Sequence, residues 1–328
     1  MKRPLVVLSA IILAMVICAC GLLLRDNRIF ALDVVQQADQ KQQAGRAVVE
    51  NAWTIGIYTG PSPFELSAPE NLKNPVLTAE DVTDLDVDIV AHPFMVVTDS
   101  LYYLFFTAKN GKTDQGGIGL AESKNGMDWE YRQIVIKEPF VLSYPCVFKW
   151  QDDYYLIPEA HTETFVRLYR ATSFPDKWTH EMDLITGDHF ISASVVHYND
   201  MWWMFVSPVG NETLRLFYAP DLKGPWTEHP RSPVVAKDKN IARPGGRPLV
   251  IDGSLYRLGQ DCDPTYGNQV FAFQITDIST TAYKEKKIDI PLVKASSKGW
   301  NADAMHHVDA HQISRNKWIA AIDALGNP

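Results

Sequence analysis

Ionisable side chains stand at the ends of several apolar, strand-like stretches of this 328-residue chain. Glu159 ends the stretch "DYYLIPE", and Asp261 ends "SLYRLGQD". A carboxylate is costly to bury alone, so each must either pair with another side chain or meet a polar ligand. A carboxylate that meets a ligand can orient it or exchange a proton with it. The choice depends on what surrounds these two residues.

A second group of polar residues lies near the starts of other strand-like stretches. If these stretches are aligned, the residues gather around one axis. The group comprises His92, Ser143, Tyr144, Ser192, Ser194, Arg243, Arg247, His306, His307 and Asp309. The two arginines could bind a ligand, or they could form ion pairs with the carboxylates above and so join neighbouring units.

Two further patterns bear on ligands. Tyr266 and Trp300 lie in glycine-containing loops, where an exposed ring could stack on a sugar face or cap the core. His307, Asp309 and His311 alternate along one strand and would share a face, which resembles a metal cluster only loosely. A ladder of hydrogen bonds is the preferred interpretation, so we predict neither a metal nor another cofactor.

A repeat positions these residues. Each unit consists of a strand, a polar turn, an aromatic strand, a loop and a third strand that leads to a closing tryptophan. The closing residues Trp129, Trp178 and Trp226 are 49 and 48 residues apart. A fourth unit lacks the tryptophan, and the fifth supplies only a strand pair, which residues 53–60, "WTIGIYTG", would complete.

The repeat predicts an all-β fold, a five-bladed β-propeller of four-stranded blades. Pairing of the N-terminal and C-terminal strands would close the ring and remove exposed sheet edges. A β-sandwich is the alternative, but it predicts neither the period nor the closing tryptophans. Helix should be nearly absent after residue 50.

The N-terminal segment has a different character. Lys2 and Arg3 precede a charge-free run from Pro4 to Leu24, whose 21 residues would form a helix long enough to cross a bilayer. We predict a signal anchor, an N-terminal transmembrane helix, over residues 1–25; the alternative is a lipoprotein signal that would make Cys20 the lipidated residue. A polar stalk over residues 26–50 and the propeller over 51–328 would follow. The propeller would be extracytoplasmic, in the periplasm or at the cell surface.

Composition narrows the possible partners. The net charge of −8 and the isoelectric point near 5.6 argue against nucleic-acid binding, which requires a basic face. Only Cys146 and Cys262 remain beyond the N-terminal segment, and we expect both to be free and packed.

Ordered short motifs carry a family resemblance. The series "AHPFM", "LSYPCVF", "YLIPEA", "ARPGGRPLV", "YRLGQDCDPTYG" and "MHHVDAH" resembles the N-terminal propeller domain of the glucosamine inositolphosphorylceramide transferases and their bacterial relatives, roughly over residues 50–325. In those transferases the glycosyl transfer is attributed to a domain that follows the propeller. We therefore do not expect transferase activity from this chain.

The family is more distantly similar to five-bladed glycoside hydrolases that act on furanosides and fructans. That similarity implies Glu159 and Asp261 as catalytic acid and base, because such enzymes place two carboxylates across the scissile bond. It implies a substrate-binding set of His92, Tyr144, Arg243, Arg247, Tyr266, His307 and Asp309. However, His92 stands where those hydrolases have an acidic residue, and the third unit offers no inward carboxylate.

Two functions follow as expectations. The first is a membrane-anchored, carbohydrate-active propeller, similar to glycoside hydrolases, that takes a carbohydrate or glycoconjugate ligand. The second is a non-catalytic glycan-binding or scaffold propeller, and recognition of a partner through the rim is a further alternative. A closed network in which Arg243 or Arg247 neutralises the two carboxylates would favour binding over catalysis.

Overall fold

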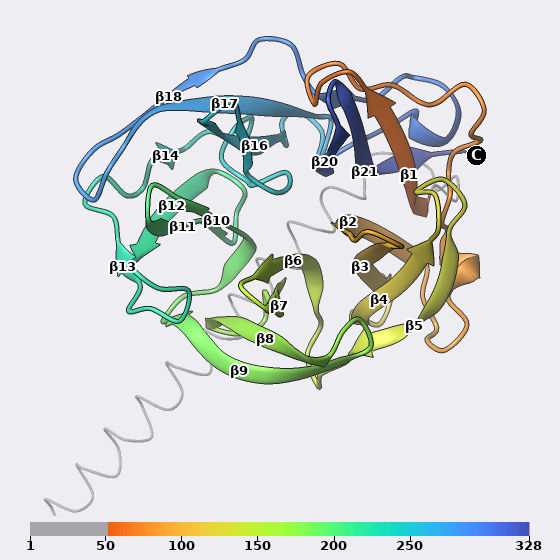
Figure 1. The fold of residues 1–328 in the computed structure, drawn as a ribbon, viewed down its shortest axis with the longest axis horizontal. Helices are drawn as coiled ribbons and strands as arrows, with labels where there is room; N and C mark the ends of the chain where they lie inside the picture. The colour runs from red at the N-terminus through yellow and green to blue at the C-terminus, as the bar shows by residue number, and fades with distance from the viewer. Residues whose placement is uncertain (1–51, 328) are drawn as a thin grey trace, which may run out of the picture. The chain divides into compact units, whose positions relative to one another are not determined.

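The computed structural model describes residues 52–327, which form a ring of antiparallel sheets (Figure 1). Each sheet is one blade. The first blade contains β2(Ile89–Val97), β3(Tyr102–Asn110), β4(Gln115–Ser123) and β5(Glu130–Ile136), and the second contains β6(Ser143–Trp150), β7(Asp153–Glu159), β8(Phe165–Ser173) and β9(Lys177–Thr186). The third blade contains β10(Phe190–Tyr198), β11(Met201–Pro208), β12(Thr213–Ala219), β13(Thr227–Glu228) and β14(Val235–Ala236); the fourth contains β15(Leu249–Ile251), β16(Ser254–Asp261), β17(Gln269–Ile278), β18(Tyr283–Lys287) and β19(Val293–Lys294); and the last contains β20(Val308–Ser314), β21(Lys317–Gly326) and β1(Ala52–Gly60). This arrangement confirms the five-bladed propeller.

The ring closes as the sequence predicts. Strand β1 pairs antiparallel with β21, from Ala52 opposite Gly326 to Gly60 opposite Trp318. The expectation of four strands in every blade is wrong for this last sheet, which has three. On the outer side of β1, the segment that follows it forms only two isolated β-bridges, Leu77 with Ile55 and Ser67 with Thr59. The segment after β1 therefore covers the outer edge as a loop and not as a fourth strand.

Local sequence explains the hairpins and the closing tryptophans. Asn199 and Asp200 both have positive φ, 50° and 58°, as the tight turn between β10 and β11 requires. Each closing tryptophan donates its indole N–H to a carbonyl of the turn just before it: Trp129 to Gly126, Trp178 to Pro175 and Trp226 to Leu222. The tryptophan thus ties the loop after the third strand to the outer edge of its blade.

The core lies between neighbouring sheets, because each blade buries both of its faces against its neighbours. Apolar residues of the second strands, such as Phe105, Leu156 and Met204, are fully buried. Cys146 and Cys262 are also buried and free, as expected. Burial raises the pKa of the Cys146 thiol to about 11, so this thiol is protonated at neutral pH.

Helix is scarce among the described residues, as predicted. Two short 3-10 turns occur, η1(Ala79–Asp81) and η2(Gly299–Asn301). In the part of the chain that the structure covers, no helix is long and apolar enough to cross a membrane. The signal anchor and the stalk, residues 1–25 and 26–50, lie outside the described residues and stay predictions.

The segment between Arg243 and β15 contains a glycine that no other residue can replace without movement. Gly246 has a φ of 144°, and a Cβ built there would lie 1.9 Å from the Val308 carbonyl oxygen. We expect Gly246→Ala to destabilise the fold by at least about 2 kcal/mol, because backbone must move apart. Gly210→Ala is the matched control, since Gly210 has a similar φ of 127° and open space around it. Equal losses of unfolding free energy in urea for both variants would contradict the expected steric effect.

Candidate functional site

The polar residues gather at one end of the ring, where the innermost strands begin and the second strands end; we call this the site end. Three innermost strands have a bulge at the same place. At these bulges His92, Tyr144 and Ser192 adopt left-handed backbone with φ of 49°, 45° and 54°. Left-handed backbone in residues with side chains persists only where the surroundings hold it, and it marks candidate functional sites.

A side chain of the preceding blade holds each bulge. The backbone N–H of Tyr144 donates to Thr107 Oγ1 at 3.0 Å, that of Ser192 to Glu159 Oε2 at 2.8 Å, and that of His92 to Asp323 Oδ2 at 2.8 Å. Thr107 and Glu159 lie at equivalent positions of β3 and β7, opposite the residue that precedes the bulge of their own blade. Glu159 therefore has a structural task, to connect the second and third blades.

Glu159 is part of a closed polar network. Its Oε2 also accepts from the Ser192 hydroxyl at 3.3 Å and lies 3.6 Å from Arg243 Nη2. Arg243 in turn donates to Ser192 Oγ and to Asn211 Oδ1, both at 3.0 Å. Of the two roles expected for Arg243, ligand binding or an ion pair with a carboxylate, the structure shows the ion pair, with Glu159. The other oxygen of Glu159, Oε1, has no hydrogen bond within residues 52–327, and it lies 3.9 Å from Nδ1 of the half-buried His161.

Asp261 belongs to a different network. Its Oδ1 accepts from the Asn240 side chain at 2.7 Å, and its Oδ2 accepts from the Gln269 side chain at 2.7 Å. Both oxygens are thus occupied by amides, with no arginine among the described residues in an ion pair with this carboxylate. The two candidate catalytic carboxylates share no hydrogen-bond partner within residues 52–327.

Arg247 and Asp309 pair with each other further along the axis. Arg247 Nε donates to Asp309 Oδ1 at 2.7 Å, and Asp309 Oδ2 accepts from the backbone of Met95 at 2.5 Å and lies 2.9 Å from His311 Nε2. Burial alone would raise the pKa of Asp309, but Arg247 and His311 more than offset it and hold that pKa below its usual range. The contact with His311 forms one part of the predicted ladder, whereas His307 makes no hydrogen bond to Asp309 within residues 52–327.

A column of rings forms one wall of the site end. The His306 ring stacks on Trp53, with centroids 3.9 Å apart, and on His92 at 4.7 Å. Tyr266 meets the edge of His306 at 5.2 Å and lies under the Arg243 guanidinium at 5.3 Å. Trp53 and Tyr266 are both half-buried as residues.

Tyr144 and His307 lie behind this column and are fully buried. The Tyr144 hydroxyl lies 2.8 Å from Ser194 Oγ and accepts from the Gly246 backbone at 2.8 Å, so it connects three blades. Burial raises the pKa of Tyr144 well above its ordinary value and lowers that of His307 to about 4. Both are neutral at neutral pH, and neither reaches solvent.

The structure brings together most of the residues predicted from sequence and adds others. Arg243 contacts Glu159 and Tyr266, and the His306 ring connects Tyr266 to His92. Asp261 lies in its own amide network. The sequence analysis missed Asp323 and Trp53. A signal for Asp323 exists, because "KWIAAID" aligns with "DYYLIPE" and places Asp323 at the position of Glu159.

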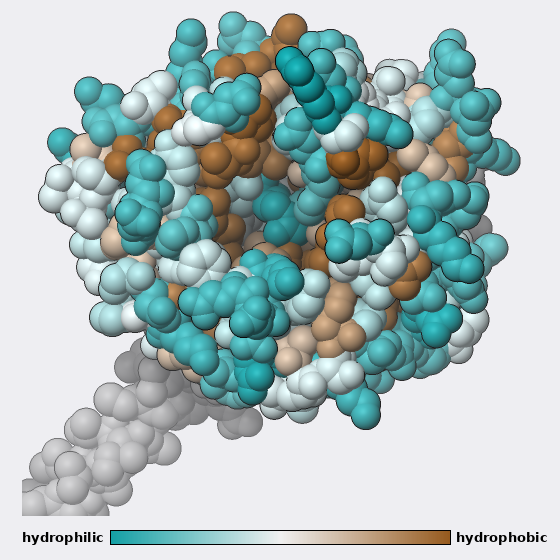
Figure 2. Space-filling view, in the orientation of Figure 1, coloured by the Kyte–Doolittle hydropathy of each residue, from teal (hydrophilic) through white to brown (hydrophobic). Residues whose placement is uncertain are grey.

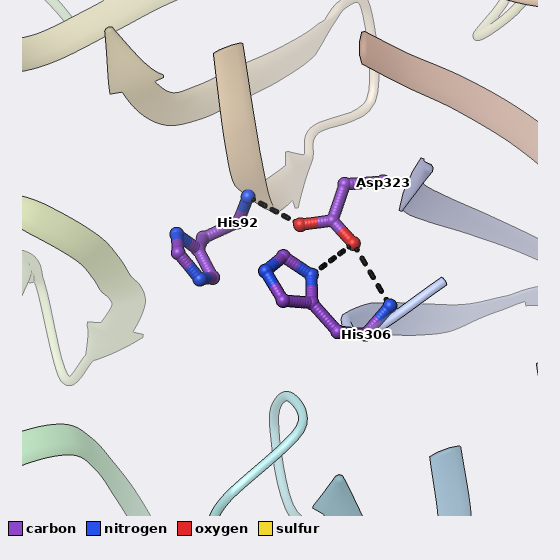
Figure 3. A group of neighbouring side chains, drawn as sticks. All are labelled: His92, His306 and Asp323. Atoms are coloured by element: carbon purple, nitrogen blue, oxygen red, sulfur yellow. Dashed lines mark hydrogen bonds and ion pairs between the residues drawn. The ribbon is translucent and has the colours of Figure 1, made fainter. Parts of the chain in front are cut away.

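The face of the ring shown in Figure 2 is hollowed at its centre. Hydrophilic residues form the floor of the hollow, and hydrophobic residues line part of its wall. Figure 3 shows how three residues of the site end meet: the Asp323 carboxylate accepts from the backbone of His92, and from both the backbone and the ring of His306. Asp323 of the last blade thus holds His92 of the first blade at the site end.

Comparison with known proteins identifies the family. The model of the N-terminal domain of glucosamine inositolphosphorylceramide transferase 1 matches residues 46–325. The chain belongs to this family. Glucosamine inositolphosphorylceramide transferase 1 of Oryza sativa subsp. japonica is 38% identical over 298 residues, which cover 84% of this chain and 40% of the relative. The chain thus spans about two fifths of the length of that curated relative.

Two solved structures with a similar fold are named as carbohydrate-active enzymes. A β-1,2-mannobiose phosphorylase from Listeria innocua has a TM-score of 0.60 at 13% identity and covers 81% of this chain and 96% of its own. Zg3597, a family 117 glycoside hydrolase from Zobellia galactanivorans, has a TM-score of 0.53 at 16% identity over 74% of this chain and 88% of its own. The family's propeller therefore resembles the folds of glycoside hydrolases and phosphorylases.

Proposed function

We propose that this propeller binds a carbohydrate or glycoconjugate at the site end. We also propose that the N-terminal segment anchors the protein to a membrane and that the propeller lies in an extracytoplasmic compartment. The rings of the half-buried residues Trp53 and Tyr266 are flat apolar surfaces of the kind that sugar faces stack on. Nε and Nη1 of Arg243 donate to Ser192 and Asn211, but Nη2 has no hydrogen bond within residues 52–327 and supplies a donor for a hydroxyl group or an anionic sugar group.

One observation favours binding over cleavage. Glu159 is buried and is held by the backbone and hydroxyl of Ser192 and by Arg243. A catalytic acid or base must exchange a proton with the substrate, but Oε2 of Glu159 already accepts from Ser192 and lies beside Arg243, so only Oε1 is left for that exchange. The blade contact through Glu159 also explains why a carboxylate stands there without any catalytic task.

Truncation of Tyr266 tests the binding proposal. We expect Tyr266→Ala to weaken glycan binding at least about tenfold, because it removes the ring that contacts both Arg243 and His306. Binding is measured on a glycan array that includes furanosides, β-mannosides and inositol-phosphate glycans, followed by calorimetry with the best ligand.

Tyr198→Ala is the matched control, since this half-buried tyrosine ends β10 and so lies at the opposite end of the blade. We expect it to bind as the unchanged protein does. Equal affinities of the unchanged protein and Tyr266→Ala for every glycan would refute a sugar site at the site end.

Cleavage is the second candidate, and the fold similarity to glycoside hydrolases and phosphorylases favours it. Glu159 and Asp261 would then act as acid and base. A screen of furanoside and pyranoside aryl glycosides, with and without phosphate, tests this function. If catalysis depends on these carboxylates, Glu159→Gln and Asp261→Asn each lower kcat at least about a hundredfold. Turnover that neither change affects would exclude both residues as acid and base.

A further inference from the structure

Asp323 is a fully buried carboxylate that no fixed cation neutralises. Its hydrogen bonds come from the backbone amides of His92 and His306 and from the His306 ring, whose Nδ1 lies 2.6 Å from Oδ1. Within residues 52–327 no lysine or arginine forms an ion pair with it, whereas the other two carboxylates on the axis each have an arginine. A buried charge without a counter-ion is costly, so the surroundings of Asp323 favour a cation.

The imidazoles beside Asp323 have ring nitrogens without partners. Nε2 of His92 and both ring nitrogens of His307 are buried, and none has a hydrogen bond within the described part of the chain. Buried polar atoms are normally satisfied, so these nitrogens indicate a missing partner.

The third observation is the closeness of the donors. His92, His306 and Asp323 each offer one ligand atom, and these atoms lie within 4.8 Å of one another (Figure 3). We propose that these three side chains bind a divalent transition-metal ion of the Zn²⁺ type. Two imidazoles and one carboxylate are a common ligand set for such ions, and they leave a coordination position open. The inference stands apart from the proposed function, because the ion binds without a sugar.

Binding requires a small adjustment of the rings. Donors around a tetrahedral Zn²⁺ lie about 3.3 Å apart, given bonds of about 2.0–2.1 Å. The stacked rings of His92 and His306, 4.7 Å apart, must therefore rotate and approach. His306 Nδ1 and Asp323 Oδ1 already lie 2.6 Å apart, so the ion would replace their hydrogen bond, and both atoms would become its ligands.

The nearby charges and the type of donor atom both influence which ion the site favours. Arg243 disfavours a cation at His306, but Glu159 lies 3.6 Å from its guanidinium and offsets much of that charge. Nitrogen donors select zinc, nickel or copper over calcium and magnesium, which prefer oxygen. The two imidazoles therefore favour a transition-metal ion over calcium or magnesium.

Calorimetric titration of the full chain with ZnCl2, after removal of any polyhistidine tag, tests the proposal. We expect one equivalent to bind, and His92→Asn to weaken its affinity at least about tenfold. Asparagine tolerates the left-handed backbone of position 92, and its backbone N–H can still donate to Asp323. His306→Gln should weaken binding similarly, since its amide can replace the hydrogen bond to Asp323 but not the imidazole ligand.

His180→Asn is the control, because His180 is exposed on β9 and pairs with Asp183 outside the site end. Cys18 and Cys20 are present in every variant, so only a difference between variants reports on this site. Absence of Zn²⁺ binding by the unchanged chain, or an affinity of both site variants equal to that of the unchanged chain, would overturn the proposal. If circular dichroism shows that the variants are unfolded, Co²⁺ added to the unchanged chain must produce visible absorption typical of nitrogen and oxygen ligands, and its absence overturns the proposal equally.

Discussion

Replacing Asp323 by alanine should unfold the propeller or lower its melting temperature more than the loss of any other bulge contact. The carboxylate accepts from two backbone amides and from the His306 ring, and all three donors are buried. Each donor left without a partner costs about 1–3 kcal/mol, so the total reaches a large part of a typical stability of about 5–15 kcal/mol. Thermal and urea unfolding followed by circular dichroism, with a chelator present, measure the loss.

Thr107→Ala provides the comparison, because Thr107 holds the Tyr144 bulge through a hydroxyl in place of a carboxylate. We expect a loss of about 1–3 kcal/mol there, clearly less than for Asp323→Ala. Asp289→Ala, at an exposed position, should change stability by no more than about 0.5 kcal/mol. If Asp323→Ala behaved like Asp289→Ala, the bond from Asp323 to His92 would not hold the first and last blades together.

Arg247→Met should destabilise the fold by about 3–5 kcal/mol at neutral pH, because it leaves the buried Asp309 carboxylate without its cation. The effect should depend on pH. With Arg247 present, the pKa of Asp309 lies below its unfolded value of about 3.9, so the pair stabilises the fold above that pH and this contribution is lost on acidification. Without Arg247, burial raises this pKa instead, and the protonated acid becomes the favoured folded form.

The two proteins should therefore differ most at neutral pH, and they should approach each other only below about pH 4, where the contribution of the Asp309 charge is lost. Urea unfolding of both proteins at several pH values measures this difference. Arg315→Met is the control, since Arg315 is exposed and has no recorded ion pair within residues 52–327. A difference between Arg247→Met and the unchanged protein that stays constant from pH 7 to below about pH 4 would contradict the assigned role of the Asp309 charge.

The closed network around Glu159 bears on how the family's propellers work. In this chain, positions at the ends of second strands hold the bulges of the next blade, whether the residue is a threonine or a carboxylate. A carboxylate at such a position is therefore not by itself a sign of hydrolysis. Glycan binding with truncation of Tyr266, and turnover with Glu159→Gln, separate the two functions for this protein.

Sequence alone predicted the blades and their order, because a repeat shows itself as a period. The spacing of Trp129, Trp178 and Trp226 sets the length of a blade, and each indole closes a turn only three or four residues away. Closure by residues 53–60 was also predictable, since the last unit lacks strands. The loop that covers the outer edge of β1 was not, because it has no repeat to follow.

The amino-acid sequence also determined which residue types lie near the axis, among them Glu159, Arg243 and Tyr266. Only the tertiary structure decided how they pair. Arg243 and Arg247 stand four residues apart in one segment, yet one meets Glu159 and the other meets Asp309, because Gly246 turns the chain between them. Asp323 meets His92 across 231 positions only when the ring closes. Such contacts depend on the direction of side chains from different blades, and no local pattern in the sequence encodes that direction.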